Sequence, residues 1–334
     1  MNALPASSTP ISAPVALFDA SHGQPNWAQT GFTSRELHTN FAGITERLCR
    51  MGFRCQAAQH KPLSKYLQGA RLLVIPPPTG SYNARKQQWR PLPTSLFSAG
   101  EVRDVLTFLH GGGRLLGFGY RFGDSFTQTN LGELLAPLGC LLNDDAVIEL
   151  RDLRHVPPLQ LHFDTPRDIL PLQWAVAGVT LVRWRPVATF TILPGSTAWP
   201  LALSAGGHCI SFDRTLRQIS FESLPIAVAG QHGDGRFVLV GGPHAFETGL
   251  FGLLNIADNA RFLMNVLQWL LSDQDSPQTI SGYNSDLAQL RTCCASQFSR
   301  IVPNGEGEQT VAYIERVLRR IGVLKALNQA KWMP

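Results

Sequence analysis

Two kinds of hydrophobic pattern alternate along the first part of the chain. Short, continuously apolar runs bounded by glycine, proline and polar residues are typical of strands buried on both faces. Between them, apolar residues recur every three or four positions, which predicts helices. We predict strands at residues 15–18, 53–57, 72–75 and 114–119, and helices at residues 33–52, 98–110 and 131–138. This order predicts an α/β fold with a doubly wound, mainly parallel, flavodoxin-like sheet and helices on both of its faces.

The clearest local signals surround the fourth of these strands. Ser98 and Glu101 have the spacing of a capping box, which marks the start of a helix. Glycines at 111–113 can adopt the positive φ that ends a helix. The apolar run 114–119 is too short for another helix, and residues 119–126 then leave the carboxyl end of the predicted strand. Open α/β sheets bind their ligands at that edge, so we expect one wall of a site here.

Beyond residue 146 the pattern becomes β-rich, with short apolar runs among prolines and tryptophans and no capped helix between them. We predict strands at residues 148–150, 179–184, 189–193 and 201–203, a hairpin of 226–229 and 236–240 around a glycine-rich turn at 230–235, and a helix at 257–271. The sequence therefore predicts a flexible N-terminus at 1–13, an α/β domain at 14–272 that contains a β-rich elaboration at 146–235, and a helical tail at 273–334.

Composition and charge narrow the class of protein. The 334 residues are 44% hydrophobic and 16% charged, with a net charge of +5, and no basic run suggests a nucleic-acid partner. No apolar stretch reaches the ~18 residues of a membrane span, and no leader sequence is expected at the start. The six cysteines have no zinc-site or C-x-x-C spacing, so we expect reduced thiols in a cytoplasmic protein and no bound metal. A dinucleotide cofactor is not expected either, because Phe122 occupies the third glycine position of the pattern that begins at Gly117.

Four segments together resemble a known family. They are V-A-L-F-D-A-S-H-G-Q at 15–24, F-L-H-G-G-G-R-L-L-G-F-G at 108–119, G-D-G-R-F-V-L-V-G-G-P at 233–243 and A-D-N-A-R-F-L-M-N-V-L-Q-W-L-L at 257–271. The chain is similar over residues 14–272 to the class I glutamine amidotransferase-like superfamily. Within it, the resemblance is to a largely uncharacterised branch related to the auxiliary subunit of gliding-motility transporters and to the amino-terminal domain of an intraflagellar-transport protein.

The resemblance implies where a catalytic nucleophile would lie. Amidotransferases carry a cysteine on the sharp turn after the strand that corresponds to 115–119, and this chain has Gly119, Tyr120 and Arg121 there. Acyl transfer from glutamine is therefore not expected. The late loop keeps His244 and Glu247, which could act as a base and its orienting carboxylate or could simply hold the loop by a hydrogen bond.

Polar residues after the first strand form a second candidate cluster. Asp19 and His22 could be an acid–base pair, two metal ligands or the hydrogen bonds of a structured loop. The loops after residues 18, 75, 119 and 240 should open on one sheet edge. We expect one crevice there, formed by Asp19, His22, Gln24, Thr79, Tyr82, Tyr120, Arg121, Asp124, His244 and Glu247.

Two functions from different classes fit these residues. The first is an accessory protein without amidotransferase activity that binds a small polar ligand or a protein partner. The second is a cysteine-independent hydrolase or lyase that uses His22 with Asp19, or His244 with Glu247, as general acid and base. In that enzyme, Tyr120 or Arg121 would hold an anionic substrate group.

The C-terminal tail carries an amphipathic pattern of its own. Residues 309–330 are predicted to form a helix whose apolar stripe contains Val311, Ile314, Val317, Leu318, Ile321 and Leu324. Such a stripe has to pack against its own domain, a second copy or another protein. The segment before it, with its break at 303–305, has the composition of a linker. We interpret the helix as part of a homodimer or partner interface.

Removal of residues 276–334 should therefore lower the oligomeric state while the α/β domain stays folded. Light scattering measures the first and circular dichroism the second. An insoluble truncated protein, or a full-length protein that is already monomeric with the helix docked on its own domain, would contradict this interpretation.

Overall fold

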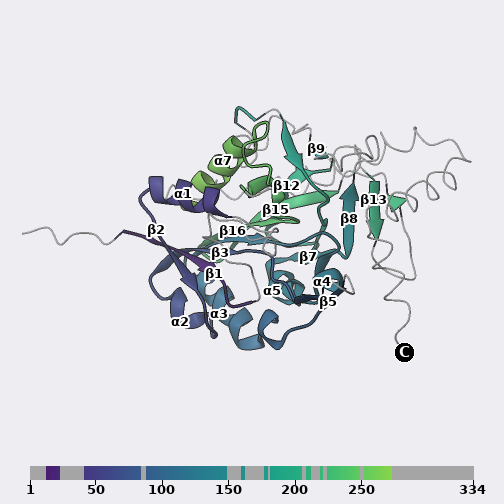
Figure 1. The fold of residues 1–334 in the computed structure, drawn as a ribbon. Coiled ribbons are helices and arrows are strands. Elements are labelled where there is room, and N and C mark those ends of the chain that lie inside the picture. The colour runs from purple at the N-terminus through teal and green to yellow at the C-terminus, as the bar shows by residue number, and fades with distance from the viewer. Residues whose placement is uncertain are drawn as a thin grey trace, which may run out of the picture.

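A seven-stranded sheet forms the centre of the molecule, with helices on both faces (Figure 1). The computed structural model describes residues 13–22, 41–83, 88–148, 159–161, 177–179, 181–204, 208–211, 219–220, 224–248 and 252–272. The sheet order is β12-β15-β16-β6-β3-β1-β2. Its strands are β1 (Val15–Asp19), β2 (Arg54–Ala58), β3 (Ala70–Ile75), β6 (Arg114–Phe118), β12 (Ala198–Leu203), β15 (Pro225–His232) and β16 (Gly235–Val240). The predicted α/β fold is confirmed.

Strand direction explains where a site can form. The strands β2, β1, β3, β6 and β16 run parallel, whereas β15 is antiparallel to β16 and β12 is antiparallel to β15. Numbered among themselves, the parallel strands have the order 2-1-3-4-5 of flavodoxin-like sheets. The loops after β1, β3, β6 and β16 therefore leave one edge of the sheet, as the sequence predicts.

The helices divide between the two faces of the sheet. Figure 1 shows α1 (Ala42–Arg50) and α7 (Asn259–Leu271) on one side, and α2 (Ser64–Leu67) and α3 (Ala99–His110) on the other. Successive strand residues point to opposite faces, so Leu116 and Phe118 join the core beneath α1 and α7, and Leu115 joins the core beneath α3. Burial on both faces explains why these strands are apolar throughout.

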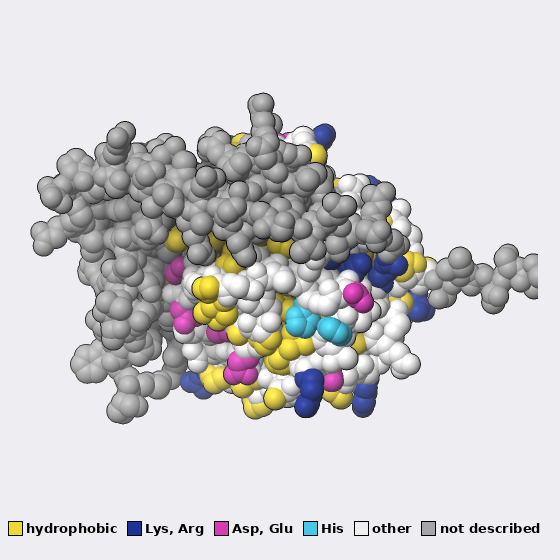
Figure 2. All heavy atoms as spheres, turned by 180° about the vertical axis from the view of Figure 1, so that it is seen from behind, with side chains coloured by type: hydrophobic (Ala, Val, Ile, Leu, Met, Phe, Trp, Pro, Cys, Tyr) yellow, Lys and Arg dark blue, Asp and Glu magenta, His cyan; other side chains and the backbone are white. Residues whose placement is uncertain are grey.

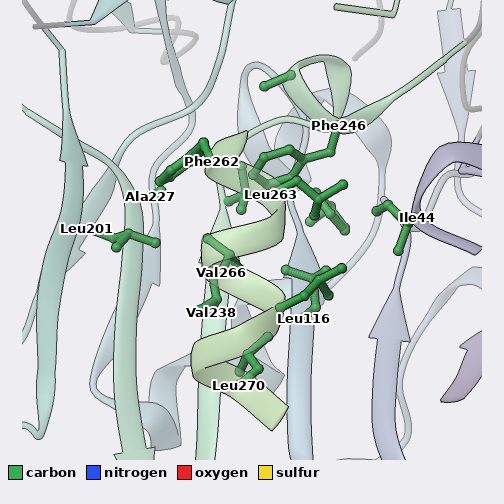
Figure 3. Close-up of a cluster of buried hydrophobic side chains, with 14 of the residues drawn as sticks. Ile44, Leu116, Leu201, Ala227, Val238, Phe246, Phe262, Leu263, Val266 and Leu270 are labelled. Atoms are coloured by element: carbon green, nitrogen blue, oxygen red, sulfur yellow. The ribbon is translucent and has the colours of Figure 1, made fainter. Parts of the chain in front are cut away.

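The helix α7 supplies much of the first core. Its side chains Phe262, Leu263, Val266 and Leu270 face the sheet and lie over Leu116, Val238 and their neighbours (Figure 3). Burying each side chain of this size stabilises the fold by about 1.5 to 3 kcal/mol relative to exposure. Trp184 and Trp199 also pack in or against this core, so neither is an exposed platform for a ligand.

The predicted start and end of α3 are both confirmed. The Ser98 hydroxyl accepts a hydrogen bond from the Glu101 backbone N–H at 3.2 Å, and the Glu101 carboxylate accepts one from the Ser98 N–H at 3.0 Å. The helix ends at His110, and Gly112 follows with a φ of 93°. The capping box thus marks the start of the helix and the positive-φ glycine marks its end, as these residue types indicate.

Several short elements surround the central sheet. Four small antiparallel sheets pair β4 with β5, β7 with β11, β9 with β10, and β13 with both β8 and β14. Their strands are β4 (Ser81–Asn83), β5 (Gln88–Arg90), β7 (Cys140–Leu142), β8 (Asp145–Ile148), β9 (Leu159–Leu161), β10 (Val182–Trp184), β11 (Phe190–Ile192), β13 (His208–Ser211) and β14 (Ile219–Ser220). The remaining elements are α4 (Gly123–Thr127), α5 (Leu131–Leu135), η1 (Pro93–Ser95), η2 (Ala136–Leu138) and η3 (His244–Phe246).

The structure corrects two local predictions. The hairpin of β15 and β16 turns at residues 233–234 and not over 230–235, because Gly230 lies within β15. A Cβ at Gly230 would lie 2.3 Å from the Phe237 ring, so this glycine serves packing and not the turn. The segment after residue 119 contains the short helix α4, which follows Phe122 in the left-handed region at φ 62°. No glycine marks that left-handed position, so the pattern did not indicate it.

Some predictions fall outside the described residues. These are the helix start at Thr33, the candidate ligand contact Gln24, and the tail with its helix at 309–330. None of the described helices is long and apolar enough to cross a lipid bilayer.

A buried arginine connects the sheet to the end of α7. The Arg236 Nη1 donates to the carbonyl oxygen of Trp269 and to the hydroxyl of Ser272, each at 2.8 Å. Its guanidinium also lies 5.4 Å from the centre of the Trp269 ring. The last carbonyl groups of a helix have no partner within the helix, so this cation satisfies one of them and complements the helix dipole.

The substitution Arg236→Met should lower the free energy of unfolding by about 1 to 3 kcal/mol, because the Trp269 carbonyl then keeps only the longer, 3.2 Å hydrogen bond from the Ser272 hydroxyl. Urea denaturation followed by circular dichroism measures the change. Arg50→Met is the matched control, since Arg50 pairs with Glu46 at an exposed site and such pairs contribute little. Equal effects of the two substitutions would contradict the capping role.

Candidate functional site

Two histidine–carboxylate pairs follow strands of the parallel sheet, one after β1 and one after β16, and β3 and β6 lie between these strands. In the first, Asp19 is the last residue of β1 and its Oδ2 lies 2.6 Å from the His22 Nδ1. The backbone N–H and hydroxyl of Ser21 donate to the other carboxylate oxygen at 2.9 and 2.8 Å. Both Asp19 and His22 are fully buried. Asp19 therefore fixes the orientation of the His22 imidazole, and both side chains lie inside the protein.

The remaining contacts of His22 enclose its ring. Phe97 stacks on the imidazole with a centroid distance of 3.8 Å, and the His22 Nε2 lies 3.6 Å from Glu101 Oε1. Asn130 holds Phe97 in place, because its side-chain amide exchanges two hydrogen bonds with the Phe97 backbone at 2.7 and 2.9 Å. This histidine connects β1 to the start of α3, and its side chain is fully buried.

Glu101 serves the helix cap and this charged cluster together. Burial favours its neutral form, but hydrogen bonds from Ser98 and the nearby His22 and Lys61 outweigh burial, so the pKa of Glu101 is lowered. The Lys61 Nζ lies 3.5 Å from the second carboxylate oxygen. The cluster thus alternates acidic and basic groups from Asp19 to Lys61.

The second pair follows β16. His244 begins η3, and its Nδ1 lies 2.6 Å from the Glu247 Oε2. Backbone bonds fix this loop, since the His244 carbonyl accepts from Leu253 N–H at 2.8 Å and the Glu247 carbonyl accepts from Leu254 N–H at 3.0 Å. The edge of the Tyr120 ring faces the imidazole at a centroid distance of 6.1 Å. An aromatic ring from the turn after β6 therefore packs against this histidine.

Two arginines lie near the second pair. The Arg121 guanidinium lies 5.6 Å from the Tyr120 ring centre and 5.7 Å from that of Phe126. Arg185 interacts electrostatically with Glu247, Arg121 and Tyr120. Burial is the main reason that the pKa of Arg185 is lowered, and Glu247 opposes that change. Among the described residues, two arginines thus lie near this pair, and the buried carboxylate of Glu247 interacts with one of them, Arg185.

Sequence reasoning missed Arg185. It follows β10, a strand far from β6 and β16 in the sequence, and no motif links it to the other site residues. Asn259 brings these segments together, because its side chain exchanges two 2.8 Å hydrogen bonds with the Arg183 backbone and donates to the Ala245 carbonyl at 3.2 Å. That buried asparagine at the start of α7 is the one local signal that could have indicated the contact.

The pKa of Glu247 is raised. Burial is the main cause, and the charges of His244 and Arg185 together with the hydrogen bond from His244 only partly offset it. The pKa of Glu247 is therefore raised and that of Glu101 is lowered, although each carboxylate lies near a histidine and a second cation.

The other predicted site residues have separate surroundings. Asp124 accepts hydrogen bonds from the Thr129 hydroxyl at 2.6 Å and from the backbone N–H groups of Leu131 and Gly132 at 3.0 and 2.6 Å. It thereby caps α5, and burial raises its pKa. Thr79 is half-buried after β3, and Tyr82 lies in β4 opposite Trp89.

The structure brings together Tyr120, Arg121, His244 and Glu247, whereas Asp19 and His22 contact Phe97 and Glu101. In the part of the chain that the structure describes, no three His, Cys, Asp or Glu residues are grouped so that they could hold a metal ion. Figure 2 shows one face of the molecule, on which basic side chains lie in separate groups among acidic and apolar ones. The described residues on that face form no continuous basic patch of the kind that binds nucleic acid.

Comparison with known proteins gives a fold and no family assignment. No protein-family model matches the sequence, and no curated protein matches it. The fold is similar to the solved mmIFT52 N-terminal domain, with a TM-score of 0.55 and 19% identity over 78% of this chain and 99% of that one. A ThuA-like protein from Bacteroides uniformis aligns with a TM-score of 0.46 and 13% identity over 80% of this chain and 96% of that one. The first likeness shows a shared fold.

The opposite pKa shifts predict opposite effects of two matched substitutions. A lowered pKa means that ionised Glu101 stabilises the fold above the ordinary glutamate pKa, and that this contribution is lost as pH falls through the folded-state value. Glu101→Gln should therefore destabilise the protein at about pH 7, and the deficit should shrink toward about pH 3.

For Glu247 the effect of pH on stability has the opposite sign, because its pKa is raised. A raised pKa means that its charge costs stability above the folded-state value, and that this cost disappears as pH falls to the ordinary glutamate pKa. Glu247→Gln should therefore be at least as stable as the wild type at about pH 7, with the difference fading at acid pH. Urea denaturation across pH measures both. Equal destabilisation by the two substitutions at neutral pH would contradict this assignment.

Proposed function

We propose that this chain is an accessory protein of the amidotransferase-like fold that performs no amidotransfer and binds a small polar ligand through an anionic group. The observation that carries the proposal lies at the turn after β6. On the turn where the resemblance places a nucleophilic cysteine, this chain has Gly119, Tyr120 and Arg121, and the Tyr120 ring packs against His244. The histidine–carboxylate pair thus faces a buried aromatic ring in place of a thiol, which supports binding over covalent catalysis.

The charges around Tyr120 support an anionic ligand. Arg121 and Arg185 provide two guanidinium groups, and the carboxylate that interacts with Arg185, Glu247, has a raised pKa. Within the described residues, the buried Nε of Arg121 has no hydrogen-bond acceptor. Guanidinium groups suit carboxylate and phosphate because their planar N–H donors match two oxygens at once. A free small molecule or an acidic group of a partner protein would present this same chemistry.

A specific observation favours a second function. The 2.6 Å contact between His244 Nδ1 and Glu247 Oε2 orients the imidazole as general bases are oriented in hydrolases. The chain could then be a cysteine-independent hydrolase or lyase, with Arg121 and Tyr120 holding an anionic substrate. The pair His22 and Asp19 supports this function less well, because its imidazole is fully buried beneath Phe97.

Binding of simple anions tests the proposal. Phosphate, malonate and citrate should each be titrated into the full-length protein, with the melting temperature and isothermal calorimetry as readouts. At least one should bind, and Arg121→Ala should weaken it by tenfold or more, about 1.4 kcal/mol or above. Arg103→Ala is the matched control, since it removes the same charge from the exposed face of α3 and should leave binding unchanged. Equal weakening by both substitutions would contradict a built site.

Activity assays separate the two functions. No ammonia should be released from glutamine, and iodoacetamide should leave anion binding unchanged, because no cysteine lies at the turn after β6. Glutamine hydrolysis abolished by substitution of a cysteine would overturn the proposal. Turnover of a small anionic ester that is lost in His244→Ala, at unchanged melting temperature, would instead establish the hydrolase.

A further inference from the structure

A pair of cysteines lies where α1 ends and β2 begins, away from the carboxyl edge. Cys49 is in the last turn of α1, and Cys55 is the second residue of β2. The chain reverses between them at Gly52, whose φ of 86° is one that residues with a Cβ rarely adopt. This tight return places the two sulfur atoms 3.9 Å apart.

The two thiols differ in their access to solvent. Cys49 is exposed, whereas Cys55 is half-buried and its sulfur also lies 3.9 Å from the Thr45 carbonyl oxygen. The pKa of Cys55 is raised to about 12, mainly by burial and to a smaller extent by the neighbouring Cys49. Cys140 differs from both, because it is fully buried in the other core. A reagent in solution therefore meets Cys49 first, with a second sulfur already beside it.

We propose that Cys49 and Cys55 are a redox-active pair that forms a reversible intramolecular disulfide by exchange with a low-molecular-weight disulfide such as oxidised glutathione. The exposed Cys49 thiolate attacks one sulfur of that disulfide, whose S–S bond breaks, and the first glutathione leaves as a thiolate that takes up a proton. Cys55 then loses its proton to solvent and attacks the Cys49 sulfur, and the second glutathione leaves. The protein loses two protons and two electrons in total, and the small disulfide is reduced to two thiols.

The structure supports this order of attack and the closure of the bond. Cys55 holds its proton strongly at neutral pH, so Cys49 makes the first attack, and the second step relies on the mixed disulfide being already beside Cys55. A disulfide requires the sulfurs to approach to about 2 Å, which rotation of the exposed Cys49 side chain on a terminal helical turn allows. The bond would join the end of α1 covalently to β2, which is an edge strand of the described sheet.

Mass spectrometry of the full-length protein in oxidised and reduced glutathione buffers tests the proposal. Under oxidising buffer the mass should fall by about 2 Da, and dithiothreitol should restore it. Trypsin cleaves after Arg50 and Arg54, so the bond should join two peptides that are otherwise separate. A stable glutathione adduct on Cys49 in the wild type, or a disulfide that involves other cysteines only, would overturn the proposal.

Two serine variants assign the roles. Cys55→Ser should keep glutathione on Cys49, with a gain of about 305 Da, because no second thiol can displace it. Cys49→Ser should form neither the intramolecular bond nor that adduct at a comparable rate, since Cys55 is shielded. Cys140→Ala is the control and should leave formation of the disulfide unchanged. Equal reactivity of Cys49 and Cys55 in the two serine variants would show that the local environment does not distinguish them.

Discussion

Burial of β6 on both faces is the constraint on which the rest of the structure depends. Every residue of Arg114–Phe118 is buried, and the strand lies between β3 and β16 at the centre of the sheet. The space beside it is so narrow that a Cβ at Gly117 would lie 2.9 Å from Leu239, and one at Gly119 would lie 2.8 Å from Leu142. Helices must therefore cover both faces, and polar residues can gather only where the strand ends. The location of Tyr120 and Arg121 is a consequence of this packing.

The two histidine pairs show that one residue pattern can serve different physical roles. Both have a carboxylate three residues away and a 2.6 Å contact to Nδ1. Around His22, an aromatic ring and a helix-capping carboxylate complete a closed cluster. Around His244, the neighbours are Tyr120 and Glu247, and burial raises the pKa of Glu247 although His244 and Arg185 oppose that change. The residues around such a pair, and not the spacing of its histidine and carboxylate, decide whether the pair stabilises a loop or contacts a ligand.

The sequence predicted features that depend on local or periodic signals. The parallel strands, the Ser98 capping box and the stop at Gly112 follow from hydrophobic pattern and from residue-specific backbone preferences. Other features depend on contacts between distant segments. Glu101 could be predicted as a cap but not as the neighbour of His22, and no spacing predicted that Arg185 approaches Glu247. Phe122 takes a left-handed conformation without a glycine, so α4 could not be predicted from residue types. Whether the carboxyl-edge residues form one crevice stays a prediction.

The outer strands of the sheet have a consequence for how copies of the chain can associate. Within the described sheet, β12 contains Pro200, which has no N–H to offer, and its pairing with β15 shifts register on either side of Ala202. At the opposite border, β2 exposes Arg54 and Gln56 to solvent. An irregular proline-containing border and a charged one are both poor templates for an added strand. This architecture protects the apolar sheet from end-to-end polymerisation, and it directs association toward side-chain surfaces instead of backbone hydrogen bonds.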